Sequence, residues 1–105
     1  MRALVCRELG PGDAEKLSLE ADWPMAELGE HDVLIDVKAP GLNFPDVLII
    51  QGKYQFQREL PLIPCGECAG VVAAVGDKVT RHKVGDKVVG AGGAGTFCAR
   101  LATHE

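Results

Sequence analysis

The sequence lacks the long apolar run that a signal peptide or a membrane helix requires, and its first residues include a charge at Arg7. It also lacks any basic run, because 11 Lys and Arg stand against 15 Asp and Glu, for a net charge of −4. A nucleic-acid surface is therefore not expected, and the acidic balance favours solubility. We expect a soluble cytoplasmic protein, with the mitochondrion as the alternative compartment, and neither a membrane nor a nucleic acid as partner.

The chain has four cysteines, which in principle could form two bridges, but nothing in the sequence marks secretion, so reduced thiols are expected. Cys65 and Cys68 have the spacing of a metal knuckle or of a redox pair, but a structural zinc site needs four ligands, usually two such pairs. A redox pair needs a helix N-terminus to lower the thiol pKa, and the residues after Cys68 favour a strand. We interpret all four cysteines, which include Cys6 and Cys98, as reduced packing residues.

With 105 residues there is room for one domain with one modest core. Alternating apolar and polar residues and turn clusters such as Gly10–Asp13 predict short strands over 2–8, 17–20, 33–39, 67–75, 87–90 and 96–103. Val33, Ile35, Val37 and Ala39 are expected on one buried face, with Pro40-Gly41 bending or ending that strand. This pattern predicts a mainly β fold, a small, partly open β-barrel with one or two short helices.

One short helix is predicted over Pro45–Gln51, because proline suits the first turn, Asp46 favours the positive end of the helix dipole, and Gly52 suits the C-terminal cap. The residues from Lys53 to Leu60, which include Tyr54, form a predicted loop. Asn43 precedes the helix, where asparagine is a common cap. The residues alone allow two interpretations. In the first, Asn43 only caps the helix and Tyr54 only packs on the surface. In the second, both side chains present polar groups to a ligand.

The stretch from Pro61 to Gly90 carries one carboxylate, Glu67, among small residues, a position in which it can be buried and then needs a partner. Within this stretch Gly-Asp-Lys-Val occurs at Gly76 and again at Gly85, which we interpret as two turns of the same chemistry. Further on, Gly90–Gly95 contains the letters of the dinucleotide fingerprint. Only ten residues remain after Gly95, too few for the helix, second strand and acidic residue that the fingerprint requires, so we expect a turn.

Several of these motifs together resemble the N-terminal domain of the medium-chain dehydrogenase/reductase family. Its members carry Gly-His-Glu-x-x-Gly-x-Val, then Val-Gly and a later Gly-Asp-x-Val, and this chain reads Gly66-Glu67-Cys68-Ala69-Gly70-Val71-Val72, then Val75-Gly76 and Gly85-Asp86-Lys87-Val88. Upstream, Gly41-Leu42-Asn43-Phe44-Pro45-Asp46 and Gln51-Gly52-Lys53-Tyr54 resemble the zinc-free quinone oxidoreductase branch. Cys65 stands where most members carry glycine.

This resemblance implies that residues 1–105 form a GroES-like N-terminal catalytic domain of an NADPH-dependent oxidoreductase that transfers hydride to a quinone or an α,β-unsaturated carbonyl. It implies catalytic roles for Asn43 and Tyr54, cofactor contacts from Asn43, Asp46 and Tyr54, and NADPH bound mainly by a Rossmann domain outside these residues. No zinc is expected, because Asn43 and Gly66 stand where zinc-dependent members carry cysteine and histidine ligands. The parent is expected to be a homodimer, and the fragment to self-associate.

Two alternatives from other classes remain open at this point. A non-enzymatic GroES-like binding or assembly module would use the same barrel, as co-chaperonins do. A degenerate family member would have lost catalysis and kept a regulatory role. Fold alone does not separate these from an enzyme.

Overall fold

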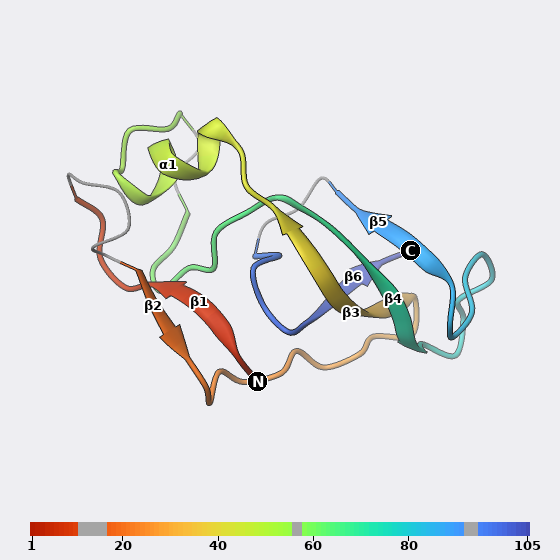
Figure 1. Ribbon diagram of the computed structural model, residues 1–105. Helices are drawn as coiled ribbons and strands as arrows, with labels where there is room; N and C mark the ends of the chain where they lie inside the picture. Colours follow the sequence, from red (N-terminus) through yellow and green to blue (C-terminus); the bar gives the residue numbers. More distant parts are fainter. Residues whose placement is uncertain (11–16, 56–57, 92–94) are drawn as a thin grey trace.

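The computed structural model describes residues 1–10, 17–55, 58–91 and 95–105, and these residues form two antiparallel sheets and a short helix (Figure 1). A two-stranded sheet has the order β1-β2, and a four-stranded sheet the order β5-β4-β3-β6. The elements are β1 (Ala3–Cys6), β2 (Leu17–Glu20), β3 (Asp32–Gly41), α1 (Phe44–Ile50), β4 (Glu67–Val75), β5 (Lys87–Gly90) and β6 (Arg100–His104). No helix among the described residues is long and apolar enough to span a membrane.

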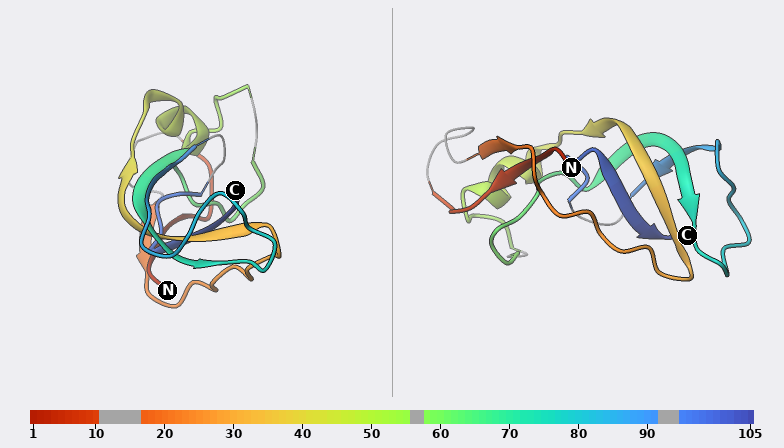
Figure 2. Two further views of the ribbon diagram at one scale, coloured as in Figure 1. Left: turned by 90° about the vertical axis from the view of Figure 1, so that its right-hand side faces the viewer. Right: turned by 90° about the horizontal axis from the view of Figure 1, so that it is seen from below.

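The long strand β3 is the centre of the larger sheet, pairing with β4 along one edge and with β6 along the other. Its pairing with β4 shifts register twice, between Leu34 and Ile35 and again between Val37 and Ala39. Such bulges bend a strand and increase its twist. Seen end-on in Figure 2, the strands of this sheet curl around one another, which gives the partial, open GroES-like barrel that the sequence predicts.

The predicted alternation along β3 holds in its first half and fails in its second. Val33 and Ile35 are buried, Val37 is half-buried, and Ala39 is exposed, because the register shift after Val37 rotates the strand. The strand also continues to Gly41 instead of ending before it. Pro40 is tolerated because the ladder is already irregular at this bulge.

The core of the described residues consists of three apolar clusters. Val33, Ile35 and Val72 form the cluster between β3 and β4, with Val88 and Leu101 packed against it. The second cluster joins β1 to the segment before β4 and consists of Ala3, Val5 and Ile63. The third joins β1, α1 and the same segment, and it consists of Cys6, Ile50 and Leu62.

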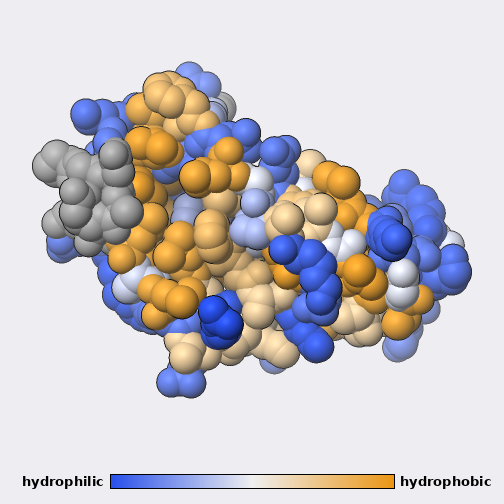
Figure 3. Space-filling view, in the orientation of Figure 1, coloured by the Kyte–Doolittle hydropathy of each residue, from blue (hydrophilic) through white to orange (hydrophobic). Residues whose placement is uncertain are grey.

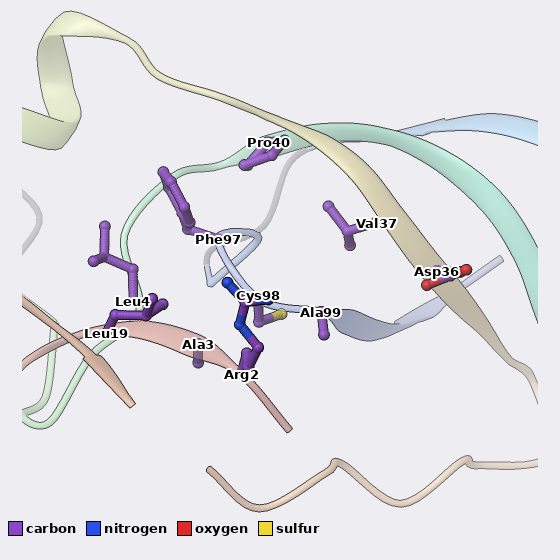
Figure 4. Close-up of a pocket in the computed structure, with 10 residues that line it drawn as sticks. All are labelled: Arg2, Ala3, Leu4, Leu19, Asp36, Val37, Pro40, Phe97, Cys98 and Ala99. Atoms are coloured by element: carbon purple, nitrogen blue, oxygen red, sulfur yellow. The ribbon is translucent and has the colours of Figure 1, made fainter. Parts of the chain in front are cut away.

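A cavity of about 290 Å³ lies between the two sheets, with Leu4, Pro40 and Phe97 among the residues drawn in Figure 4.

Most predicted elements are confirmed, and the differences are at their ends. The predicted bounds of β2, β4 and β5 agree with the structure. The helix begins at Phe44, one residue before the predicted start, with Gln51 as its C-cap and Gly52 at φ +73°. The last strand was predicted from residue 96 but begins at Arg100. Before it, the backbone turns at Thr96, whose carbonyl accepts from the Cys98 N–H at 2.9 Å. The turn predicted at Gly10–Asp13 lies mostly outside the described residues.

The two Gly-Asp-Lys-Val segments need glycine for different reasons, so the interpretation as equivalent turns is wrong. Gly85 has φ +94°, a conformation that glycine adopts without strain. At Gly76 the requirement is space, since a Cβ atom would stand 2.2 Å from the Gly29 carbonyl oxygen. The local sequence is the same, but the surroundings differ.

Gly70 allows a close approach between β3 and β4. A Cβ atom on this residue would stand 2.4 Å from the backbone oxygen of Asp36, which cannot move without breaking the strand pairing. We therefore expect Gly70→Ala to lower the free energy of unfolding by about 2 kcal/mol. Gly29→Ala is a matched control, because the nearest atom there is a movable Asp32 carboxylate oxygen at 2.7 Å, and it should cost less. Urea unfolding of both variants measures this difference, and equal stabilities would contradict the packing described here.

Candidate functional site

The candidate site is the entry to α1, where the end of β3 turns into the helix. Asn43 is the N-cap residue, in an extended conformation, and Pro45 lies in the first turn. The Asp46 carboxylate accepts a hydrogen bond from the Asn43 backbone N–H at 2.8 Å, and the Asp46 N–H lies 3.1 Å from the Asn43 carbonyl oxygen. The backbone of Asn43 is thus fixed in the manner of a capping box.

The side chain of Asn43 extends from this cap toward β4. Its Nδ2 donates to Oε1 of Glu67 at 3.1 Å, and both side chains are exposed. The strand register explains the contact, because Gly41 pairs with Glu67 and brings the two segments together. The Glu67 side chain packs over Gly41, where a Cβ atom would stand 2.7 Å from the Glu67 Cγ atom. The sequence allows Glu67 to be buried, but the residue lies at the surface, where Asn43 is its partner.

Asp46 faces inward, in contrast to Asn43, and is only 6% exposed. Its negative charge lies near the Cys65 thiol and contributes to the raised pKa of that thiol. The charge of Arg58 interacts favourably with it, while Arg58 Nη1 donates to the Ile63 carbonyl at 2.8 Å. The buried carboxylate therefore has the partners that burial requires, and it connects α1 to the segment before β4. Its predicted contact with a cofactor stays a prediction.

Cys65 has two unusual features. It is 2% exposed and has φ +76°, a left-handed conformation that residues with a Cβ atom rarely adopt. Burial, followed by the nearby charge of Asp46 and the hydrogen bond to it, raises the pKa of the thiol to about 11. The left-handed backbone explains why glycine suits this position. Cysteine adds a buried thiol close to the charge of Asp46.

Tyr54 lies in the turn that follows α1, so the helix separates it from Asn43. The helix has 7 residues, which at 1.5 Å per residue places its two ends roughly 10 Å apart. Tyr54 is half-buried. The structure thus brings Asn43 and Asp46 together and places Tyr54 at the far end of the same helix.

Two cavities flank the hydrogen bond between Asn43 and Glu67. Leu42, Asp46 and Pro64 are among the lining residues of the first, a largely apolar cavity of about 140 Å³ against β1 and β2. Gly41, Glu67 and Val89 are among those of the second, about 330 Å³ in volume. The site residues therefore stand between two hollows of the surface that differ in polarity.

Exposed apolar side chains surround the same entry. Leu42 and Phe44, on either side of Asn43, are 70% and 73% exposed. Figure 3 shows apolar residues over α1 and along β1 and β2, while the end of the molecule near the β4–β5 connection is richer in hydrophilic residues. A polar amide between two exposed apolar residues is typical of a binding surface.

Neither the cysteines nor the histidines form a metal or redox centre among the described residues. No group of three or more His, Cys, Asp or Glu is arranged to hold a metal ion in that part of the chain. Cys65 and Cys68 are both buried free thiols, and burial raises the pKa of each. A raised thiol pKa opposes thiolate chemistry, so the interpretation of this pair as packing residues agrees with the structure.

The sequence indicates Asn43 and Asp46 as site residues, but it does not show that Glu67 holds the first and that Cys65 and Arg58 surround the second. The signal for Glu67 was present, because a carboxylate among small residues indicates a close neighbour. That the neighbour is Asn43 follows only from the strand register. Contacts of Cys65 and Arg58 with Asp46 have no local sequence pattern.

Comparisons with known proteins agree on one family. The model of the alcohol dehydrogenase GroES-like domain matches residues 29–105. The quinone oxidoreductase of Lama guanicoe is 40% identical over 88 residues, 84% of this chain and 26% of that protein. The synaptic vesicle membrane protein VAT-1 homolog of Danio rerio is 44% identical over 88 residues, 84% of this chain and 18% of that protein.

Solved structures similar to this chain include quinone oxidoreductases as well. The quinone oxidoreductase of Pseudomonas syringae pv. Tomato DC3000 has a TM-score of 0.87 at 36% identity, over 99% of this chain and 31% of that one. The Escherichia coli quinone oxidoreductase complexed with NADPH has a TM-score of 0.85 at 28% identity, over 97% and 30%. This chain spans about a quarter or less of the length of the curated relatives named above.

The contact between Cys65 and Asp46 predicts an inert thiol. With a pKa of about 11, roughly one Cys65 in a thousand is a thiolate at pH 8. Its alkylation should therefore be slow and rise about tenfold per pH unit up to pH 10, without a plateau. Asp46→Asn should speed the reaction only in part, because burial is the larger cause of the shift. Mass spectrometry of each cysteine tests this, with half-buried Cys98 as internal control, and a plateau near pH 8 for Cys65 would contradict it.

Proposed function

Because the chain belongs to the alcohol dehydrogenase GroES-like domain family of medium-chain dehydrogenases/reductases, we propose that it is the substrate-facing domain of an NADPH-dependent oxidoreductase of the quinone oxidoreductase type. The reaction is hydride transfer to a quinone or an α,β-unsaturated carbonyl without zinc. The observation that carries the proposal is the exposed Asn43 amide bound to Glu67. At this point of the fold, the resemblance gives zinc-dependent members a cysteine ligand.

The residues present suit hydrogen-bond chemistry better than metal chemistry. An amide and a phenol are poor zinc ligands but good partners for a carboxamide or a carbonyl oxygen. Asn43 is exposed and held by Glu67, and Gly66 offers no ligand at the second position that the resemblance assigns to zinc. Polarisation of the substrate then relies on hydrogen bonds from the protein.

NADPH supplies the hydride when it is bound, and the chain's residues set the geometry around it. Asn43 orients the nicotinamide end or the acceptor, and the Tyr54 hydroxyl donates a hydrogen bond to the acceptor carbonyl. The resemblance assigns most of the dinucleotide affinity to a second, Rossmann domain. A solved relative with NADPH in its crystal, mycobacterial Rv1454c, is 34% identical to this chain, which supports the choice of cofactor.

The exposed Leu42 and Phe44 suit a face that another part of the parent protein covers. We propose that this face lines the cleft to the second domain, and that the 105-residue chain alone self-associates through it. A homodimeric parent in the cytoplasm completes the proposal. The partner in the reaction is then a small molecule, neither nucleic acid nor lipid surface.

A second candidate is a family member that has lost catalysis. The VAT-1 homolog of Danio rerio, named as a synaptic vesicle membrane protein, matches this chain at an identity similar to that of the quinone oxidoreductases. In that case Asn43 and Tyr54 have no role in turnover, and the site residues keep only their structural contacts. The following prediction separates the two candidates.

In the full-length parent, Asn43→Ala and Tyr54→Phe should each lower turnover with a quinone acceptor by about tenfold or more, because each removes one orienting hydrogen bond. Steady-state kinetics with NADPH measures the effect, and thermal unfolding of each variant shows that the domain remains folded. Gln55→Ala, an exposed residue next to Tyr54, is the matched control. Unchanged rates in both site variants would favour the non-catalytic candidate.

Zinc content is a direct test of the proposed chemistry. We expect purified parent protein to contain far less than one zinc per chain and to keep its activity after dialysis against a chelator, because the proposed turnover needs no bound metal. Elemental analysis before and after dialysis gives the result. One zinc per chain, lost together with activity, would refute the zinc-free reading.

A further inference from the structure

Glu67 holds the Asn43 side chain, but the function proposed above gives it no effect on turnover. Its carboxylate accepts a hydrogen bond from Asn43 Nδ2 at 3.1 Å, although the two residues are far apart in the sequence. An ionised carboxylate only accepts hydrogen bonds, while an asparagine amide has a donor end and an acceptor end. The contact therefore fixes which end of the Asn43 amide faces β4.

The backbone of Glu67 is held firmly enough to act as a reference point. Its carbonyl accepts from the hydroxyl of Thr96 at 2.8 Å, and Thr96 is only 2% exposed. The residue also starts β4 and pairs with Gly41 at the end of β3. Because Gly41 has no side chain, the Glu67 side chain packs directly on the backbone there. Its carboxylate thus has a fixed base and a close neighbour.

Asn43 is held at two places by different carboxylates. Asp46 binds its backbone N–H at 2.8 Å, and Glu67 binds its side-chain amide. The first contact is part of the helix cap and belongs to the fold. The second joins two exposed side chains, and hydrogen bonds of this kind contribute little net stability. A contact of small energetic value that fixes an amide at a candidate site is better explained by orientation than by stability.

From this geometry we infer that Glu67 is a positioning residue, which holds the Asn43 amide in the orientation that a bound nicotinamide or carbonyl acceptor requires. The inference rests on the proposed function. It assigns Glu67 no contact with the ligand, only control of the residue that makes the contact. Without Glu67, the Asn43 amide loses the hydrogen bond from its Nδ2 and with it part of the preorganisation on which turnover depends.

Three variants near the contact and one control variant separate this role from a general structural effect. Glu67→Ala removes the acceptor, and turnover of the full-length parent should fall about fivefold to tenfold, mainly in kcat. Glu67→Gln keeps an amide oxygen that accepts from Asn43 and should keep most of the activity. Gly41→Ala keeps the carboxylate but displaces it, since the new Cβ would stand 2.7 Å from Glu67 Cγ and 2.9 Å from Oε1. Glu27→Gln, at another exposed glutamate, should leave the rates unchanged.

A double-mutant cycle tests whether Glu67 acts through Asn43. If it does, Glu67→Ala has no further effect in an Asn43→Ala background, whereas independent roles give multiplied losses. A loss of turnover in Asn43→Ala with wild-type rates in Glu67→Ala would overturn the positioning role alone. Unchanged turnover in Asn43→Ala would overturn the proposed function and the positioning role with it.

A readout without turnover completes the test. In the ¹⁵N-labelled 105-residue chain, the two Nδ2 protons of Asn43, assigned by their loss in Asn43→Ala, should resonate apart from those of side-chain amides that have no hydrogen-bond partner. Glu67→Ala should move both signals to the positions of a free asparagine side chain, and Glu67→Gln should leave them largely in place. Identical Asn43 signals in the wild type and in Glu67→Ala would overturn the inference, whatever the kinetics of the parent.

Discussion

The double pairing of β3 is the constraint on which the rest of the structure depends. Because β4 and β6 both pair with this strand, its position sets the curvature of the larger sheet and the direction in which the chain leaves toward α1. The two register shifts turn its second half, so that Gly41 meets Glu67 and the following residues reach the surface. The contact between Asn43 and Glu67 is a consequence of this register.

Electrostatics then divides the entry to α1 into an inner and an outer half. Asp46 points inward to Cys65 and Arg58, so one charge is buried with partners and ties the helix to the segment before β4. Glu67 points outward and stays in contact with water, where its bond to Asn43 contributes orientation. Two carboxylates close to the same residue thus have separate roles, which their burial decides.

Prediction from sequence succeeds here where the local pattern determines the answer. Alternation and turn residues define β2, β4 and β5, and Pro45, Asp46 and Gly52 define the helix to within a residue at each end. It fails where distant contacts decide, as in the exposure of Ala39 after a bulge and the backbone turn at Thr96 that delays β6. At the site, the sequence indicates Asn43 and Glu67 one by one, each from its own neighbouring residues. Their contact depends on the pairing of Gly41 with Glu67, which no short window of sequence contains.

The order in which the strands are synthesised has a consequence for β3, because its two partners become available at different times. Its second partner, β6, begins at Arg100, about sixty residues after the end of β3, which at typical elongation speeds is roughly 3–12 s of synthesis. During this interval one edge of the nascent β3 has no partner and is open to pairing with other chains. Asp36 and Lys38 place opposite charges along that strand and form an ion pair at 3.0 Å. Charged side chains on a strand edge discourage pairing with other chains, and Asp36 lies on the stretch of β3 that β6 later covers.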